Sequence, residues 1–135
     1  MNKLVRFGVS LESDLLKAFD TVVRQKKYPT RSKAIADLLR KELSERAWDE
    51  NRKVFGIISL AYDHHKRLLV NQLLHIQHDH HHQILTSQHL HINHHVCLEI
   101  IAVCGQGGEI KALFNKLKAQ KGVLHAAFTE SMTVE

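Results

Sequence analysis

Residues 84–104 read ILTSQHLHINHHVCLEIIAVC, and this stretch decides the fold of the larger part of the chain. It holds two segments rich in apolar and β-branched residues, 84–93 and 96–104, with a polar turn at 93–95 between them. Two such segments joined by a short polar turn are typical of a β-hairpin. We therefore predict two adjacent antiparallel strands.

Alternation along the first of these strands determines which side chains share a face. Successive side chains point to opposite sides of a strand, so His89 and His91 share one face, and Leu90 and Ile92 share the other. If the turn has an odd number of residues, Cys97 lies opposite His91 on that same face. Two imidazoles and a thiol are then held together on a stiff sheet.

The segments on either side of the hairpin complete a β-α-β-β-α-β order. The pattern predicts a strand at 54–62, a helix at 63–83, the two hairpin strands, a helix at 109–120 and a strand at 123–130. This is the order of the ferredoxin-like split βαβ unit. We expect this domain to span residues 51–135.

A second, smaller unit precedes it in residues 1–50. Residues 4–11, LVRFGVSL, alternate in apolar character, which predicts a strand. Two helices follow, for which Ser13 and Thr30 are the expected caps. Residues 41–53 are polar and charged, and we expect them to end the second helix and continue as a linker. A strand-helix-helix unit of this size buries too little apolar surface to fold alone, so we expect a partner chain. The predicted fold class of the whole chain is α+β.

Composition and charge narrow the function classes. The formal charge of +5 lies entirely within residues 1–53, which hold 13 Lys and Arg against 8 Asp and Glu, and this points to a polyanionic partner. No apolar stretch approaches the ~20 residues of a membrane span. Two cysteines are too few for a disulfide framework, so we expect a cytoplasmic protein with no membrane partner.

The histidines lie in the second domain, outside the basic segment. All 12 lie between His64 and His125, and nine fall within residues 75–95. The two imidazoles and the thiolate of the hairpin suit Ni(II), Cu or Zn rather than Mg or Ca. The histidines around His78 and His80 are candidates for a fourth ligand, from the same chain or another subunit. Spacing alone does not choose between these metals.

The basic segment resembles the ribbon-helix-helix repressors over residues 4–46, in its strand-helix-helix order and in the stretch Arg31-Ser32-x-Ala34-Ile35. The resemblance implies that two chains form one ribbon, which enters the major groove of double-stranded DNA. The DNA-binding residues it implies are Arg6, Gly8, Ser10 and Arg31.

The whole chain resembles the NikR family of nickel-responsive transcriptional regulators. The motifs that carry the resemblance are Gln77-His78, His89-Leu90-His91-Ile92-Asn93-His94 and Cys97-Leu98-Glu99-Ile100. The resemblance implies an ACT-type second domain and a homotetramer built as a dimer of dimers. It implies one Ni²⁺ per subunit in a planar site, formed by His89, His91 and Cys97 of one subunit and His78 of a neighbour.

The same resemblance implies a function. Lys66 and Arg67 are expected to contact the DNA backbone of an operator with palindromic half-sites. Nickel binding is expected to raise the affinity for the operator. By the family resemblance, we expect the protein to be a repressor of nickel-uptake genes.

Two residues depart from the family pattern. Lys33 stands where relatives often have an acidic residue, so its ammonium is expected in place of a secondary cation, although Asp37 is kept. Gly8 stands where many relatives have Thr or Ser, so their operator sequence does not carry over.

Three alternatives remain open at the level of sequence. The chain could be a ribbon-helix-helix repressor that responds to another metal or to none. It could be a metal storage or delivery protein, with His80–His82 and His94–His95 as weak sites. A metalloenzyme would need an open coordination position and a general base such as Glu99, which has the parity of Cys97 on its strand and is expected on the same face.

Overall fold

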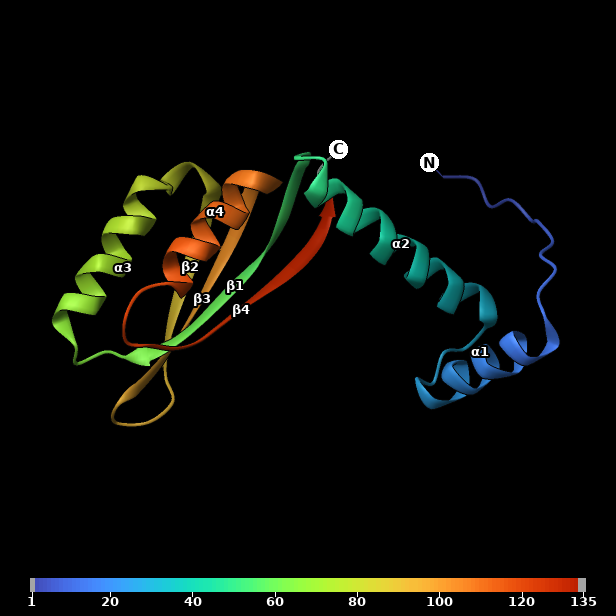
Figure 1. The fold of residues 1–135 in the computed structure, drawn as a ribbon, viewed down its shortest axis with the longest axis horizontal. Helices are drawn as coiled ribbons and strands as arrows, with labels where there is room; N and C mark the ends of the chain where they lie inside the picture. The colour runs from blue at the N-terminus through green and yellow to red at the C-terminus, as the bar shows by residue number, and fades with distance from the viewer. Residues whose placement is uncertain (1, 134–135) are drawn as a thin grey trace. The chain divides into compact units, whose positions relative to one another are not determined.

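The computed structural model describes residues 2–133 of the chain (Figure 1). The chain forms two compact units that divide after Leu39, inside helix α2 (Arg31–Asp49). No helix within residues 2–133 is long and apolar enough to span a lipid bilayer.

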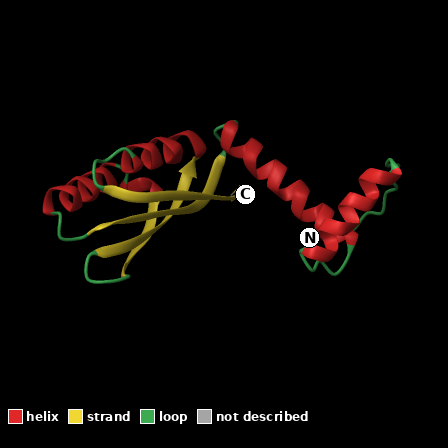
Figure 2. Cartoon of the chain, turned by 60° about the horizontal axis from the view of Figure 1, so that its bottom comes forward, coloured by secondary structure: helices red, strands yellow, loops and turns green. Residues whose placement is uncertain are grey.

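The second unit is built on a four-stranded antiparallel sheet within the described residues. Its strands are β1 (Lys53–Asp63), β2 (Ile84–His91), β3 (Val96–Gln106) and β4 (Val123–Thr133), in the order β2-β3-β1-β4. Helices α3 (Arg67–Asp79) and α4 (Gly107–Lys118) cover one face, and a short 3₁₀ turn, η1 (His81–Gln83), follows α3 (Figure 2). The predicted β-α-β-β-α-β order is confirmed, and the α+β sheet domain is consistent with an ACT-type fold.

The core lies between the sheet and its two helices. Alternate residues of β1 and β3 are buried, and they pack against the apolar stripes of α3 and α4. The fully buried residues of this core include Ile58, Leu60, Leu73, Ile101 and Leu113. The opposite face of the sheet is also apolar, and Phe55, Ile57 and Leu90 are exposed there. A second protein surface is needed to remove this face from water.

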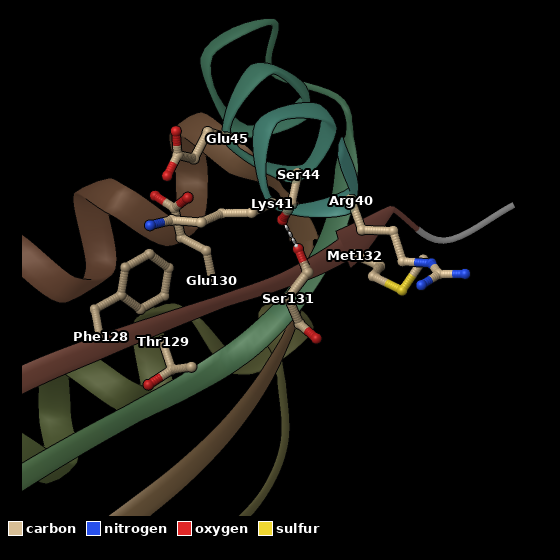
Figure 3. Close-up of a pocket in the computed structure, with 9 residues that line it drawn as sticks. All are labelled: Arg40, Lys41, Ser44, Glu45, Phe128, Thr129, Glu130, Ser131 and Met132. Carbon is tan, nitrogen blue, oxygen red and sulfur yellow. Dashed lines mark hydrogen bonds between the residues drawn. The ribbon is translucent and has the colours of Figure 1, made fainter. Parts of the chain in front are cut away.

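The last turns of α2 belong to the sheet unit. Ala47 and Trp48 are buried, and the Trp48 ring meets the Phe128 ring edge-on at 4.8 Å. The Trp48 indole N–H donates to the Ser131 carbonyl at 3.2 Å, and the Ser44 hydroxyl donates to the same oxygen (Figure 3). The end of α2 is therefore fixed to β4.

This docking differs from the sequence prediction for residues 41–53, which was a helix end followed by a linker. The helix continues to Asp49, because Ala47 and Trp48 supply apolar area that the sheet unit buries. A cleft of about 500 Å³ lies beside the docked helix, between Lys41 and Glu130 (Figure 3).

The first unit contains α1 (Ser13–Gln25) and the start of α2. The Thr30 hydroxyl accepts a hydrogen bond from the Lys33 amide at 3.1 Å, which confirms Thr30 as a cap. The expected Ser13 cap is wrong, because Ser13 is already helical and Glu12 occupies the N-cap position. Residues 2–12 form no strand in the single chain, unlike the strand predicted at 4–11. A strand needs a hydrogen-bonded neighbour, and the prediction assigned that neighbour to a second chain.

Close packing at the end of α2 gives a stability prediction. A Cβ at Gly107 would lie 2.7 Å from the Trp48 carbonyl oxygen and 3.1 Å from its Cα. We expect Gly107→Ala to destabilise the sheet unit by about 1–3 kcal/mol, because backbone must move to make room. Urea unfolding followed by the fluorescence of Trp48, the single tryptophan, measures this.

Gly108→Ala is the matched control. Its Cβ would meet the Asn51 side chain, 2.9 Å from the oxygen and 3.5 Å from Cγ, and no backbone of another segment within 4 Å. The Asn51 oxygen accepts the Gly108 amide at 2.8 Å, so we expect a smaller loss of stability, limited to the weakening of this hydrogen bond. Equal losses of stability in the two variants would contradict a rigid contact between Gly107 and the end of α2.

Candidate metal centre

The β2–β3 hairpin sets the geometry of the site. Cys97 pairs with His91, and Glu99 pairs with His89. The Ile92 amide donates to the Val96 carbonyl at 2.9 Å, which leaves a three-residue loop. The Asn93 side-chain oxygen accepts the His95 and Val96 amides at 2.8 and 2.9 Å and closes this loop. The prediction that Cys97 lies opposite His91 is confirmed.

The His89 ring lies between two chemically different partners. Its Nδ1 is 3.9 Å from the Cys97 sulfur, and its Nε2 is 3.4 Å from a carboxylate oxygen of Glu99. A histidine that ligates a metal through one nitrogen commonly donates its other N–H to a carboxylate. The geometry therefore presents Nδ1 toward the thiol and leaves Nε2–H for Glu99.

Glu99 is 1% exposed, yet each of its oxygens has a hydrogen-bond donor. The Tyr62 hydroxyl donates to Oε1 at 2.9 Å, and the Gln77 amide donates to Oε2 at 3.0 Å. Burial and the neighbouring Glu99 charge raise the pKa of Tyr62, so its hydroxyl stays protonated and remains a donor. The sequence placed Glu99 on the face of Cys97, which is confirmed, but it did not reveal Tyr62 or Gln77 as its partners.

His91 and His78, the two remaining predicted ligands, have different neighbours. The His91 ring stacks on His64 at 4.6 Å between centroids, near the end of β1. Exposed His78, at the end of α3, approaches the His81 ring at 5.9 Å, and within residues 2–133 it has no contact with the other three ligands. One chain thus places His89 beside Cys97 and pairs His91 with Cys97 across the hairpin. Among residues 2–133, however, the ligand atoms of these three residues do not all lie within 4.8 Å of one another, so the ligand set, including His78, stays a prediction.

The predicted DNA-binding residues of the first segment lie on exposed backbone. Arg6, Gly8 and Ser10 fall in the irregular stretch 2–12, and a Cβ at Gly8 would meet no atom within 4 Å. Arg31 is exposed and forms a two-point ion pair with Asp20, at 2.8 and 2.7 Å.

Other charged candidates lie on helices. The Lys33 ammonium lies 2.5 Å from the Asp37 carboxylate, one turn along α2, and its replacement of a secondary cation stays a prediction. Lys66 and Arg67 are exposed at the N-terminal end of α3, where the helix dipole also favours anions such as phosphate.

The donor set of the hairpin fits a borderline transition metal. It offers a thiol and two imidazoles with a buried carboxylate behind one of them, and both cysteines of the chain are free thiols. Thiolate and imidazole are ligands for Ni, Cu and Zn.

Comparison with known proteins decides the family. Residues 55–130 match the family model described as the NikR C terminal nickel binding domain. The chain belongs to the NikR family of nickel-responsive regulators. This is a family of regulators and not of enzymes, so the alternative of a metalloenzyme based on Glu99 is set aside.

Relatives match the regulator over its whole length. Proteins named "Putative nickel-responsive regulator" in Syntrophus aciditrophicus and Chlorobium limicola are 48% and 47% identical over 131 residues, which is 97% of this chain and 96% and 98% of theirs. The one in Desulfovibrio desulfuricans is 47% identical over 100% of this chain and 98% of its own.

A solved structure supports the fold alone. An uncharacterized protein of Thermotoga maritima matches with a TM-score of 0.53 at 18% identity, over 58% of this chain and 98% of that one.

The buried carboxylate gives a prediction for metal affinity. Glu99→Gln removes the charge that faces His89 Nε2, although its amide oxygen can still accept one hydrogen bond. Loss of such an outer partner commonly weakens metal binding, so we expect nickel affinity to fall by about 10–100-fold. Competition titration with a nickel chelator measures this.

Glu109→Gln is the control, because Glu109 is exposed and accepts a hydrogen bond from the Gln83 amide, away from His89. Nickel affinity that is unchanged in Glu99→Gln would show that the carboxylate does not orient His89.

Proposed function

We propose that this regulator is a nickel-dependent, sequence-specific DNA-binding protein that represses nickel-uptake genes. The observation that carries the proposal is the hairpin, which brings His89 within 3.9 Å of Cys97 and pairs His91 with Cys97. Full-length similarity to proteins named as nickel-responsive regulators supports nickel as the metal.

We assign one Ni²⁺ per subunit to His89, His91 and Cys97 of one chain and His78 of a neighbour. Two features support a site shared between chains in a homotetramer. His78 is exposed and lies apart from the other three ligands of its own chain. The open face of the sheet exposes Phe55 and Ile57, and a second copy would cover it.

The first segment supports a ribbon-helix-helix dimer. Val5 is 79% exposed and Phe7 is 72% exposed, although both belong to the apolar side of the alternating stretch. They line an apolar groove of about 550 Å³ with residues of α1 and α2, including Phe19 and Ile35. Pairing two copies of stretch 4–11 would bury this surface and form the ribbon.

The dimer accounts for the proposed DNA contacts. In a ribbon of two strands, Arg6, Gly8 and Ser10 occupy the face opposite the groove, and the twofold symmetry matches palindromic half-sites. Arg31 would contribute to the DNA interface beside the ribbon.

Helix α3 connects the proposed metal site with the proposed backbone contacts. It carries Lys66 and Arg67 at its N-terminal end and His78 at its other end. Metal ligation by His78 would order this helix and present the two basic residues to phosphate. Linkage is reciprocal, so nickel and DNA each strengthen the binding of the other. A coupling of about 1–3 kcal/mol between them corresponds to roughly 5–150-fold tighter DNA binding with nickel.

The first test compares three metal conditions and then removes one proposed ligand, the Cys97 thiolate. Binding to the promoter DNA of this gene and of adjacent nickel-transport genes is measured by fluorescence anisotropy without metal, with Ni²⁺ and with Zn²⁺. We expect Ni²⁺ to give a large gain in affinity, and we expect Cys97→Ser to abolish the gain because a hydroxyl is a poor ligand for nickel.

Cys104→Ser is the control, since Cys104 pairs with Phe55 at the far end of β3 from the hairpin loop. Equal DNA binding in all three metal conditions would contradict nickel sensing and would support DNA binding alone.

The second test concerns the basic segment. Each phosphate neutralised lowers log K by about 0.9 per tenfold increase in salt. We expect Arg6→Ala to weaken operator binding and relax base preference, because Arg6 is the cation among the ribbon residues. Lys66→Ala should instead reduce the salt slope by about one without changing base preference.

Lys118→Ala, on the last residue of α4, serves as the control for net charge. If Arg6→Ala had no more effect than Lys118→Ala, the ribbon assignment would fail.

A further inference from the structure

Three potential ligands outside the proposed nickel set meet at the loop end of the sheet. Asp63 ends β1, His65 follows it, and His95 belongs to the β2–β3 loop. One ligand atom from each lies within 4.8 Å of the other two. The side chains are half-buried for Asp63 and exposed for the two histidines, so an ion in solution can reach all three.

Backbone hydrogen bonds already hold these residues in place. The His65 amide donates to the Asp63 carboxylate at 2.9 Å, and the His65 Nδ1 lies 3.3 Å from the same oxygen. The His64 amide donates to the His95 carbonyl at 3.3 Å, which joins the end of β1 to the loop. The Asn93 side chain fixes the His95 amide from the other side. The three ligand positions therefore need only side-chain rotation to close on an ion.

From this arrangement we infer that Asp63, His65 and His95 form a second metal site, separate from the site with Cys97, that takes a divalent borderline cation such as Ni²⁺ or Zn²⁺. Two imidazoles and one carboxylate suit these ions at bond lengths near 2.0–2.2 Å. Three protein ligands leave coordination positions for water. The absence of a thiolate from the set and the exposure of both imidazoles make this the weaker of the two sites.

One histidine separates the two sites. The His64 ring lies tilted against the His65 ring, at 4.2 Å between centroids, and stacks on the His91 ring at 4.6 Å. Its Nδ1 is buried and has no hydrogen-bond partner among the described residues. His64 therefore packs as a spacer between His65 of the second site and His91 of the first.

The second site has a structural consequence for the first. An ion held by Asp63, His65 and His95 would link the end of β1 to the loop that connects β2 and β3. That loop sets the register of His91 against Cys97. Occupation of the second site would thus resist opening of the hairpin that carries the nickel ligands.

The test uses the full chain with Cys97→Ser, so that it does not depend on the nickel site of the proposed function. Equilibrium dialysis with Ni²⁺ and with Zn²⁺ counts the ions bound per chain. Adding His65→Ala or Asp63→Asn should weaken binding of one ion by about tenfold or more, since even an outer-shell partner commonly contributes 10–100-fold. His75→Ala is the control, because His75 lies on α3, is exposed and faces Asp79 of the same helix at 3.6 Å.

Zinc titration followed by amide NMR locates the ion. We expect the largest shifts at residues 63–65 and 93–96, and we expect them to vanish in His65→Ala. Shifts confined to His80–His82, or the same zinc affinity with and without His65, would overturn the second site. Because every sample lacks the Cys97 thiolate, failure of nickel-dependent DNA binding would leave this result unaffected.

Discussion

The buried carboxylate of Glu99 is the interaction on which the rest of the metal centre depends. A charge this far from water must be matched by donors, and here Tyr62 comes from β1, Gln77 from α3 and His89 from β2. One side chain therefore ties two strands and a helix to its own strand β3. Any of these elements can shift only by breaking a hydrogen bond to a buried charge, which keeps the His89 ring aimed at Cys97.

Local periodicity was sufficient to predict part of this centre. Alternation along a strand and the length of one loop placed His91 opposite Cys97 and put Glu99 on the same face, and both features follow from residues close in sequence. The partners of Glu99 were not predictable in this way. Tyr62 and Gln77 lie 37 and 22 residues away from it, and each reads as an ordinary residue of an amphipathic element.

Two other differences between the sequence predictions and the structure also depend on partners outside the local sequence. Trp48 lies in a charged stretch that resembles a linker, and only its contact with Ser131 of β4, 83 residues later, shows why the helix continues. Stretch 4–11 has the pattern of a strand, but the hydrogen bonds of a strand require a neighbour that one chain does not supply. The first error reflects a partner that is distant in the sequence, and the second reflects a stretch that has no hydrogen-bonded neighbour among the described residues.

The pairing of β3 also limits how this protein can change over evolution. β3 is paired with both β1 and β2, and its alternate residues Ile101 and Val103 are buried, so the core fixes the face on which Cys97 lies. A residue inserted within β2 or β3 would turn every side chain beyond it to the opposite face, because side chains alternate with a period of two. A residue inserted in the loop at 93–95 would disturb the turn and leave the two strands on their faces. Among descendants that keep the site, gaps should therefore fall in this loop and not in β2 or β3.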